Sequence, residues 1–295
     1  TLVRWQWLSS VAKVDLCLVK ILEAHHDAIA ILSELGHPGL IGDGIWAVWG
    51  AEAPTAIATL KSTKESATPT LVGAKAWASG ADIATHALVT TRDGNVRGLA
   101  AVNIHDARVS YCADRWQAVG MARVSSGEVA FADVPVEVVG APGDYLSRPG
   151  FWHGGAGIAA CWYGGACAVA NTLRIHPRVM KDPHAAAHLG AIDIQLCAAR
   201  ALLRELASRI DHDPQSGHAL QVTRARSYIE RVCTDVIDRV GRALGAGPLC
   251  LDGQHAQLCA DLTTFIRQSH AEHDLESIGH QVHGEASAWS LNLLD

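Results

Sequence analysis

The sequence LVGAKAWASGA at residues 71–81 is the stretch that decides the fold. β-favouring residues within 70–79 predict a strand there. In that strand Trp77 and Ser79 point to the same face, because successive side chains alternate. A flat indole beside a hydroxyl suits a ring with hydrogen-bonding edges. Taken alone, the strand is explained better by an ordinary sheet-core tryptophan. Other parts of the sequence are needed to favour a ring-binding site.

Two neighbouring stretches give this strand its context. The sequence GMARVSS at 120–126 continues into VAFADVPV at 129–136, and WAVWGAE stands upstream at 46–52. The stretches 71–81 and 120–136 resemble the "GxKxW(I/C)(T/S)xA" and "G(M/L)RxSxxxxVxFxDVxVP" segments of acyl-CoA dehydrogenases. Residues 46–52 resemble the strand and turn that read "xxxxTEP" in that family, with Ala51 where the family has threonine. The resemblance implies bound FAD, with Trp77 and Ser79 on the isoalloxazine ring and Trp49 and Ala51 in the same site.

The order of predicted elements divides the chain into three parts. Apolar residues at helical spacing predict an amphipathic helix over 11–35, with Lys13, Lys20, Glu23 and Asp27 on its other faces. Short β-rich pieces follow at 46–49, 70–79, 86–91, 99–104, 128–131 and 134–139. The Gly- and Pro-rich stretch 140–150 is interpreted as a linker.

Four helices are predicted after that linker. They cover 154–174, 183–210, 220–244 and 255–268, and the first is so poor in charge that we expect it to be buried on all sides. Helices, then sheet, then helices is a segregated α+β order. The predicted fold is that of acyl-CoA dehydrogenases: an N-terminal helical segment (1–44), a middle antiparallel β-barrel domain (45–140) and a C-terminal four-helix bundle (141–295).

Composition excludes several classes of function. The 295 residues are 49% hydrophobic and 18% charged, with a formal net charge of -6, which indicates a packed protein without a basic nucleic-acid surface. No run of 18 apolar residues occurs, so neither a membrane span nor a secretory signal is expected. We expect a cytoplasmic location. The eight cysteines contain no CxxC pair and are interpreted as reduced core residues.

Histidines near the C-terminus could suggest a metal site. His270 and His273, and likewise His280 and His283, stand three residues apart. No HExxH or comparable signature accompanies them, and a solvent-facing helix explains the spacing more simply. No metal site is therefore predicted, and the His25-His26-Asp27 run is interpreted as a polar helix face.

The sequence RALGAGP at 242–248 resembles the "QxxGGxG" turn of the same family. The resemblance implies that Gly245 and Gly247 lie near the adenosine half of an FAD bound by a neighbouring subunit, since glycine lets a backbone approach a cofactor closely. A helix C-cap at Gly245 explains the same glycines equally well. The arginine that pairs with the FAD pyrophosphate in relatives has no clean match, although Arg174, Arg178 and Lys181 are nearby.

The catalytic base of the family is missing from its usual place. α,β-Dehydrogenation of an acyl thioester needs a carboxylate to remove the α-proton while the flavin accepts a hydride. Counted from Asp261, which matches an "RD" pair of relatives, the expected glutamate position is Ser269. The family's alternative position falls in 156–165, which contains no acid. His270 or Glu272 is the predicted substitute.

Three functions stay open. The first is an FAD-dependent dehydrogenase of an acyl thioester, most simply a CoA ester, with His270 or Glu272 as base. The second is a flavin-dependent monooxygenase or hydroxylase of the same fold, because such relatives often carry histidine near this position. The third is a non-catalytic protein that binds flavin or acyl groups. Only one or two helices fit before Ile45, so either upstream residues are missing or the N-terminal domain is short.

The resemblance also implies partners. Members of the family complete each FAD site across a subunit interface, so a homodimer or homotetramer is expected. An electron-transfer flavoprotein is the expected electron acceptor by the same analogy.

Overall fold

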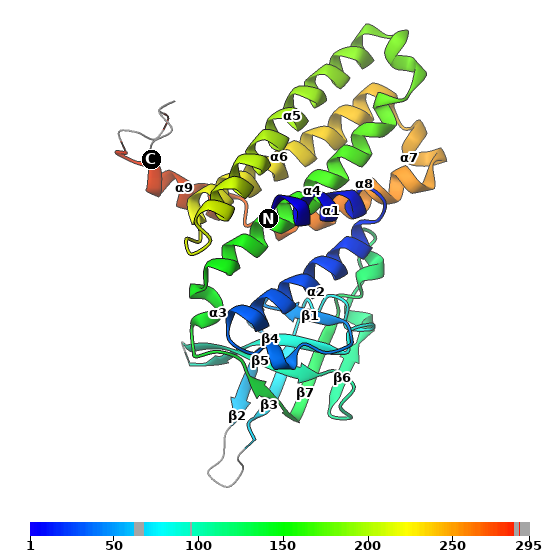
Figure 1. Ribbon diagram of the computed structural model, residues 1–295. Helices are drawn as coiled ribbons and strands as arrows, with labels where there is room; N and C mark the ends of the chain where they lie inside the picture. Colours follow the sequence, from blue (N-terminus) through cyan, green and yellow to red (C-terminus); the bar gives the residue numbers. More distant parts are fainter. Residues whose placement is uncertain (62–67, 95, 286–288, 290–295) are drawn as a thin grey trace.

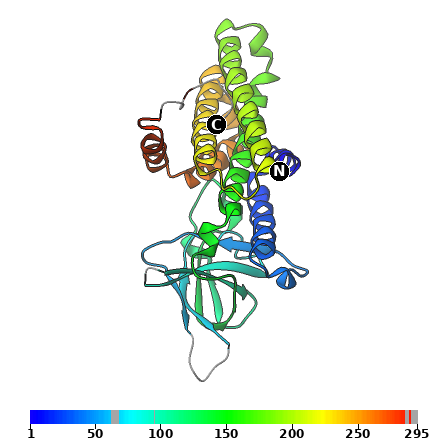
Figure 2. The same cartoon turned by 60° about the vertical axis from the view of Figure 1, so that its left-hand side comes forward.

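The computed structural model describes residues 1–61, 68–94, 96–285 and 289. The helical bundle and the β domain lie at opposite ends of the molecule, and helix α2 runs between them (Figure 1). The turned view shows the same two-part arrangement, with α9 standing away from the bundle (Figure 2). Any site at the junction of the two parts is therefore built from both.

Two helices replace the single one expected over 11–35. Helix α1 spans Leu2–Ala12 and α2 spans Leu16–Glu34. The break has a local cause: the Asp15 carboxylate caps α2 by accepting a hydrogen bond from the Leu18 N–H at 3.0 Å. The expectation that the charged residues of this region take polar faces is wrong for Lys20 and Glu23, which are only 8% and 3% exposed.

Two four-stranded sheets form the β domain. Their orders are β1-β4-β5-β8 and β2-β3-β7-β6. The strands are β1 (Trp46–Trp49), β2 (Ala58–Lys61), β3 (Thr70–Lys75), β4 (His86–Asp93), β5 (Val96–Asn103), β6 (Val109–Cys112), β7 (Glu128–Pro135) and β8 (Glu137–Val138). Residues from both sheets, among them Trp49, Leu71, Val89 and Phe131, share one core. The sheets pack face to face, and no pairing between described strands closes them into one ring.

The expectation of an antiparallel domain is wrong for one pair. β1 and β4 are parallel, with Trp46 opposite His86. Parallel neighbours need a long crossover between them, and β2 and β3 occupy that crossover in the other sheet. The strand predicted over 70–79 ends at Lys75, and one continuous β7 replaces much of the two pieces predicted at 128–139.

The four predicted bundle helices are present. They are α4 (Pro149–Arg174), α5 (Pro183–His212), α6 (Ala219–Leu244) and α8 (Gly253–Phe265). Short helices α3 (Asp144–Ser147), α7 (Gly247–Leu251) and α9 (Glu272–Val282) add to them, and α3 lies inside the expected linker. As predicted, α4 is largely buried. Gly164 allows this, because a Cβ there would lie 2.4 Å from the Ser9 carbonyl oxygen of α1.

Helix α5 exposes an unusual amount of apolar surface. Its most apolar 18-residue window has a mean hydropathy of 1.2, yet only 17% of that window is buried. α5 is long and apolar enough to cross a membrane, but core helices of soluble proteins meet the same two criteria. Ile194, 71% exposed, lies on this helix.

Candidate functional site

A cavity of about 680 Å³ opens where the β domain meets the bundle. Its volume is typical of small-molecule and cofactor sites. We call it the Trp77 cavity. It is lined by Lys20, Val48, Gly50, Ala51, Trp77, Ser79, Trp116, Met121, Val124, Ser126, Thr263, Thr264, Phe265, Arg267 and Gln268.

The β side of the Trp77 cavity is formed where β3 ends. Trp77 has a left-handed backbone (φ 59°), so it leaves the strand and its side chain stays 60% exposed. The Ser79 hydroxyl lies 2.9 Å from the Ser126 hydroxyl. The Trp49 indole N–H donates to the Ser79 carbonyl oxygen at 3.1 Å. Trp77 and Ser79 thus reach the same cavity from a turn, not from one face of a strand as the sequence suggested.

A strained loop forms the next part of the wall. The rings of Trp116 and Trp77 meet edge to face, with centroids 6.2 Å apart. The Trp116 indole N–H donates to the Met121 carbonyl oxygen at 3.2 Å. Met121 (φ 59°) and Ser125 (φ 49°) also have left-handed backbones. Such conformations are unfavourable for residues other than glycine and gather at functional sites, and three of them lie in this region.

Helix α8 closes the cavity from the bundle side. The Met121 N–H donates to the buried Asp261 carboxylate at 2.5 Å. Gly120 makes this approach possible, because a Cβ there would lie 2.0 Å from the Ala260 carbonyl oxygen. The β domain and α8 are therefore in direct contact beside the cavity.

Two charged residues line the Trp77 cavity. The Lys20 ammonium lies 3.1 Å from the Glu23 carboxylate, and both side chains are buried. Arg267 pairs with Glu230, and its side chain is 57% exposed. Within the described part of the chain, no carboxylate lines this cavity.

A second buried lysine stands behind the wall. Lys75 donates to the Ala51 carbonyl oxygen at 3.0 Å and to the Thr90 hydroxyl at 2.7 Å. Burial lowers the pKa of this ammonium to about 8. Lys75 therefore holds the turn that carries Ala51 and does not itself line the Trp77 cavity.

The structure brings together only some of the predicted site residues. Ala51, Trp77 and Ser79 line the Trp77 cavity, while Trp49 is 1% exposed and lies behind it. His270 does not line it: its side chain is 74% exposed and faces Asp274.

Two further positions in this region stay outside the lining. Glu272 begins the exposed helix α9 and is itself exposed. Ser269, the position expected for the family's glutamate, accepts a hydrogen bond from the Ala271 N–H at 3.2 Å and does not line the cavity. In this conformation neither predicted base faces the Trp77 cavity.

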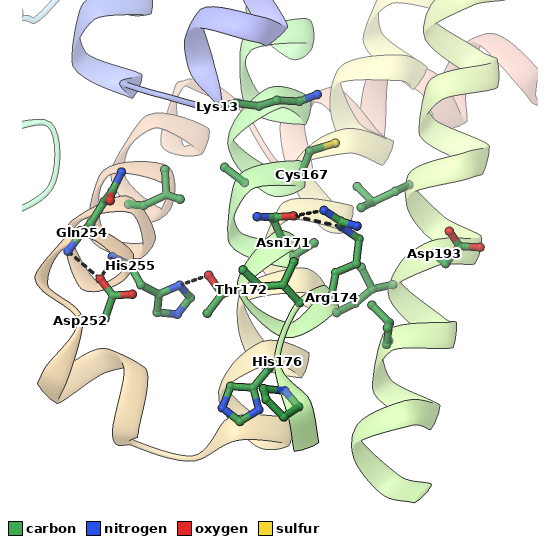
Figure 3. Close-up of a pocket in the computed structure, with 18 residues that line it drawn as sticks. Lys13, Cys167, Asn171, Thr172, Arg174, His176, Asp193, Asp252, Gln254 and His255 are labelled. Carbon is green, nitrogen blue, oxygen red and sulfur yellow. Dashed lines mark hydrogen bonds between the residues drawn. The ribbon is translucent and has the colours of Figure 1, made fainter. Parts of the chain in front are cut away.

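Gly245 and Gly247 lie at the turn from α6 to α7, with nothing within 4 Å of a Cβ at either. Neither glycine lines the second large cavity, but Asp252 and Gln254, which follow α7 in the chain, do. That cavity, of about 940 Å³, lies between α4, α5 and α8 and is called the Arg174 cavity (Figure 3). Its polar lining includes Lys13, Asn171, Thr172, Arg174, His176, Asp193, Asp252, Gln254 and His255.

Hydrogen bonds fix several side chains of the Arg174 cavity. The Arg174 guanidinium donates to the Asn171 amide oxygen at 2.6 and 3.0 Å. The His255 ring lies 2.9 Å from the Thr172 hydroxyl, and burial lowers the pKa of His255 (Figure 3). The sequence offered three cations near the end of α4 for an FAD pyrophosphate. Arg174 is the one of these that lines the Arg174 cavity.

No described group of three or more His, Cys, Asp or Glu side chains is placed to hold a metal ion. His270, His273 and His280 have side chains 74%, 79% and 78% exposed. All eight cysteines are free; the expectation that they are core residues is wrong for Cys112, Cys197 and Cys250, which are exposed.

Comparison with solved structures identifies the architecture. Butyryl-CoA dehydrogenase from Megasphaera elsdenii superposes with a TM-score of 0.81 at 17% identity, over 94% of this chain and 80% of that one. The chain has the acyl-CoA dehydrogenase fold. No protein-family model and no curated protein matches the sequence.

Other proteins with this fold carry out different chemistry. A dibenzothiophene monooxygenase from Paenibacillus sp. A11-2, solved with FMN and indole, gives a TM-score of 0.81 at 20% identity, over 94% of this chain and 82% of that one. A nitrososynthase from Micromonospora carbonacea var. africana gives 0.80 at 17% identity, over 95% and 82%. At such identities the likeness shows the fold alone.

Sequence reasoning missed several cavity residues. Lys20 was assigned to a polar helix face, and Trp116 and residues 263–268 were not singled out. One signal was available: Lys20, Glu23 and Asp27 recur at helical spacing beside apolar positions, which puts charge close to the core-facing stripe.

Proposed function

We propose that this protein is a flavin-dependent oxidoreductase whose isoalloxazine ring binds in the Trp77 cavity. The observation that carries the proposal is the convergence of Ala51, Trp77 and Ser79 on one cavity. These residues come from two stretches that resemble flavin-binding segments. A shared sheet core alone would not bring an exposed indole, a hydroxyl and a tight turn to the same opening.

The residues of the Trp77 cavity suit such a ring. Trp77, Trp116 and Met121 supply apolar surface, and the Ser79 and Ser126 hydroxyls supply hydrogen-bonding groups at one side. A bound flavin supplies hydride or electron transfer, while the protein binds and orients the reactants. Docking of the 120–126 loop onto α8 closes one side of the cavity, and exclusion of water by a bound ring would strengthen polar contacts there.

FAD is the proposed form of the cofactor. The Arg174 cavity offers a cation and a polar wall, and Asp252 in its lining directly follows α7, the helix that begins at Gly247. A second copy of the chain would bring its own cofactor's adenosine half to this surface. The exposed apolar face of α5 supports a homodimer or homotetramer, because such a face is stabilised by burial against a partner.

The proposed reaction is α,β-dehydrogenation of an acyl thioester, with an electron-transfer flavoprotein as the acceptor. It requires His270 or Glu272 to turn toward the Trp77 cavity as base. The flavin-dependent monooxygenase is the second candidate. One observation favours it: Lys20 and Arg267, and no described carboxylate, line the cavity.

An absorption spectrum of the purified protein tests the proposal. We expect a flavin band, either as purified or after addition of FAD, that is weaker in a Trp77→Ala variant at the same FAD concentration. Anaerobic bleaching by an acyl-CoA supports the dehydrogenase. Oxygen-dependent oxidation of added reduced flavin, coupled to substrate hydroxylation, supports the monooxygenase. A protein that binds neither FAD nor FMN refutes the proposed function and leaves the non-catalytic hypothesis.

A further inference from the structure

A charged stripe lies buried on one face of α2. Lys20, Glu23 and Asp27 follow each other at spacings of three and four residues, so they share that face. Lys20 and Glu23 are 8% and 3% exposed, and the Asp27 side chain is 15% exposed. Charged side chains are almost never buried to this extent unless they are paired, because removal from water is unfavourable.

Stability does not explain the stripe. A buried ion pair contributes little net stability, and replacing both partners with apolar residues is often neutral or stabilising. Because Lys20 lines the Trp77 cavity, a role in ligand binding accounts for the buried pair better than stability does.

Cations and carboxylates alternate around this pair. Lys20 donates to Glu23 at 3.1 Å. Burial lowers the pKa of the Arg226 guanidinium, which lies within the electrostatic influence of Asp274 and Glu23. Arg226 donates to the carbonyl oxygens of Gly155 at 2.6 Å and Gln268 at 3.1 Å, and it forms no ion pair with a described carboxylate. Glu23 therefore lies near two cations, Lys20 and Arg226, and near the Asp27 carboxylate.

The Lys20 ammonium also has donors to spare. An ammonium carries three N–H groups, and Glu23 is its hydrogen-bond partner among the described residues. Lys20 lines the Trp77 cavity, and Gln268, to which Arg226 donates, lines it too. In an otherwise largely apolar cavity, a cation interacts strongly with an anionic oxygen because little water screens the pair.

We propose that Lys20 is a ligand-binding residue of the Trp77 cavity that selects small apolar or aromatic molecules carrying a carboxylate, and that Glu23 is its positioning residue. The claim that such molecules are substrates rests on the proposed function. The claim that they bind in the cavity does not. The two Trp rings at the cavity, Trp77 and Trp116, provide the apolar contact for such a ligand.

Two probes of the same shape test the selection. Benzoate and benzamide differ in charge and little in size, and their dissociation constants are measured by calorimetry on the protein as purified and after loading with FAD. We expect the wild-type protein to bind benzoate at least about tenfold more tightly than benzamide. Equal affinities for the two probes would overturn the proposal.

Variants locate the preference. Lys20→Met alone leaves Glu23 buried and unpaired, which is strongly destabilising, so the informative variant is Lys20→Met with Glu23→Gln. We expect this double variant to lose the preference for benzoate, and Lys20→Arg to keep it. Lys61→Met, which removes the same charge from an exposed site on β2, is the control and should behave as wild type. A preference that survives in the double variant refutes the role of Lys20.

Flavin affinity is measured on the same variants to separate the two proposals. Because Lys20 lines the cavity proposed for the isoalloxazine ring, the benzoate preference of the double variant is measured on the FAD-free protein, where its loss is attributable to the ligand alone. If no variant binds flavin but the benzoate preference follows Lys20, the proposed function fails and this inference stands.

Discussion

Replacing Gly120 with alanine tests whether the β domain and the bundle together form the Trp77 cavity. A Cβ at this position would lie 2.0 Å from the Ala260 carbonyl oxygen and 2.4 Å from the Thr264 hydroxyl. The Ala260 carbonyl belongs to α8 and cannot rotate away. The loop must therefore move by more than an ångström, which removes the Met121 N–H from the buried Asp261 carboxylate.

The expected loss follows from these two contacts. Overpacking a close contact destabilises by about 1–3 kcal/mol. Loss of one donor to a buried carboxylate adds roughly 1 kcal/mol or more, although Gln257 still donates to Asp261 at 2.8 Å. We expect Gly120→Ala to lower the free energy of unfolding by about 3 kcal/mol, and FAD affinity to fall at least about tenfold.

Urea unfolding followed by tryptophan fluorescence measures the first quantity, and flavin titration measures the second. Gly190→Ala is the matched control, because Gly190 lies in α5 with nothing within 4 Å of its Cβ position. Alanine there should stabilise the protein by ~0.5–1 kcal/mol. A Gly120→Ala protein with wild-type stability and wild-type FAD affinity would refute the contact between the two parts.

Three more substitutions have defined outcomes. Trp77→Ala should raise the FAD dissociation constant by roughly tenfold, about 1.4 kcal/mol, with little change in melting temperature because its side chain is 60% exposed; a lower melting temperature with unchanged affinity would contradict this. Asp15→Ala removes the cap of α2 and the ion pair with Arg123, so denaturation should show a loss of ~1–2 kcal/mol. Asp15→Asn keeps the cap and should lose less. Burial and Glu23 raise the pKa of Asp27 from 3.8 to about 6, so the contribution of Asp27 to stability is fully present below pH 3.8 and is lost as pH rises through about 6, by at most ~3 kcal/mol. Asp27→Asn should remove that decline, and an unchanged pH profile would contradict the assignment.

Local sequence signals predicted the elements whose boundaries are set locally. The strand WAVW at 46–49 was predicted with its observed bounds. Helix α5 begins at Pro183 after the capping residue Asp182, and α6 ends at Gly245, so both follow well-known boundary preferences. The order of helices and sheet then followed, because segregated elements leave few arrangements.

Features that depend on distant contacts were not predictable. The parallel pairing of β1 with β4 depends on where the crossover passes, which no local pattern encodes. The left-handed backbone of Trp77 is unfavourable for tryptophan and is held by its surroundings. The sequence places Lys20 and Glu23 beside apolar positions of α2, but hydrophobic periodicity alone puts charges on the solvent side of a helix and does not show that both are buried or that Lys20 lines a cavity.

The edge-to-face contact between Trp77 and Trp116 should produce a circular-dichroism signal that reports on the Trp77 cavity. Two indoles with centroids 6.2 Å apart and planes at 85° are close enough for their excited states to couple, and this produces a circular-dichroism signal that isolated rings lack. The chain has nine tryptophans, so the contribution of the pair is read from the difference between wild type and Trp116→Phe. A molecule that enters between the β domain and α8 would displace one indole and change that difference, so occupancy could be followed without a coloured ligand.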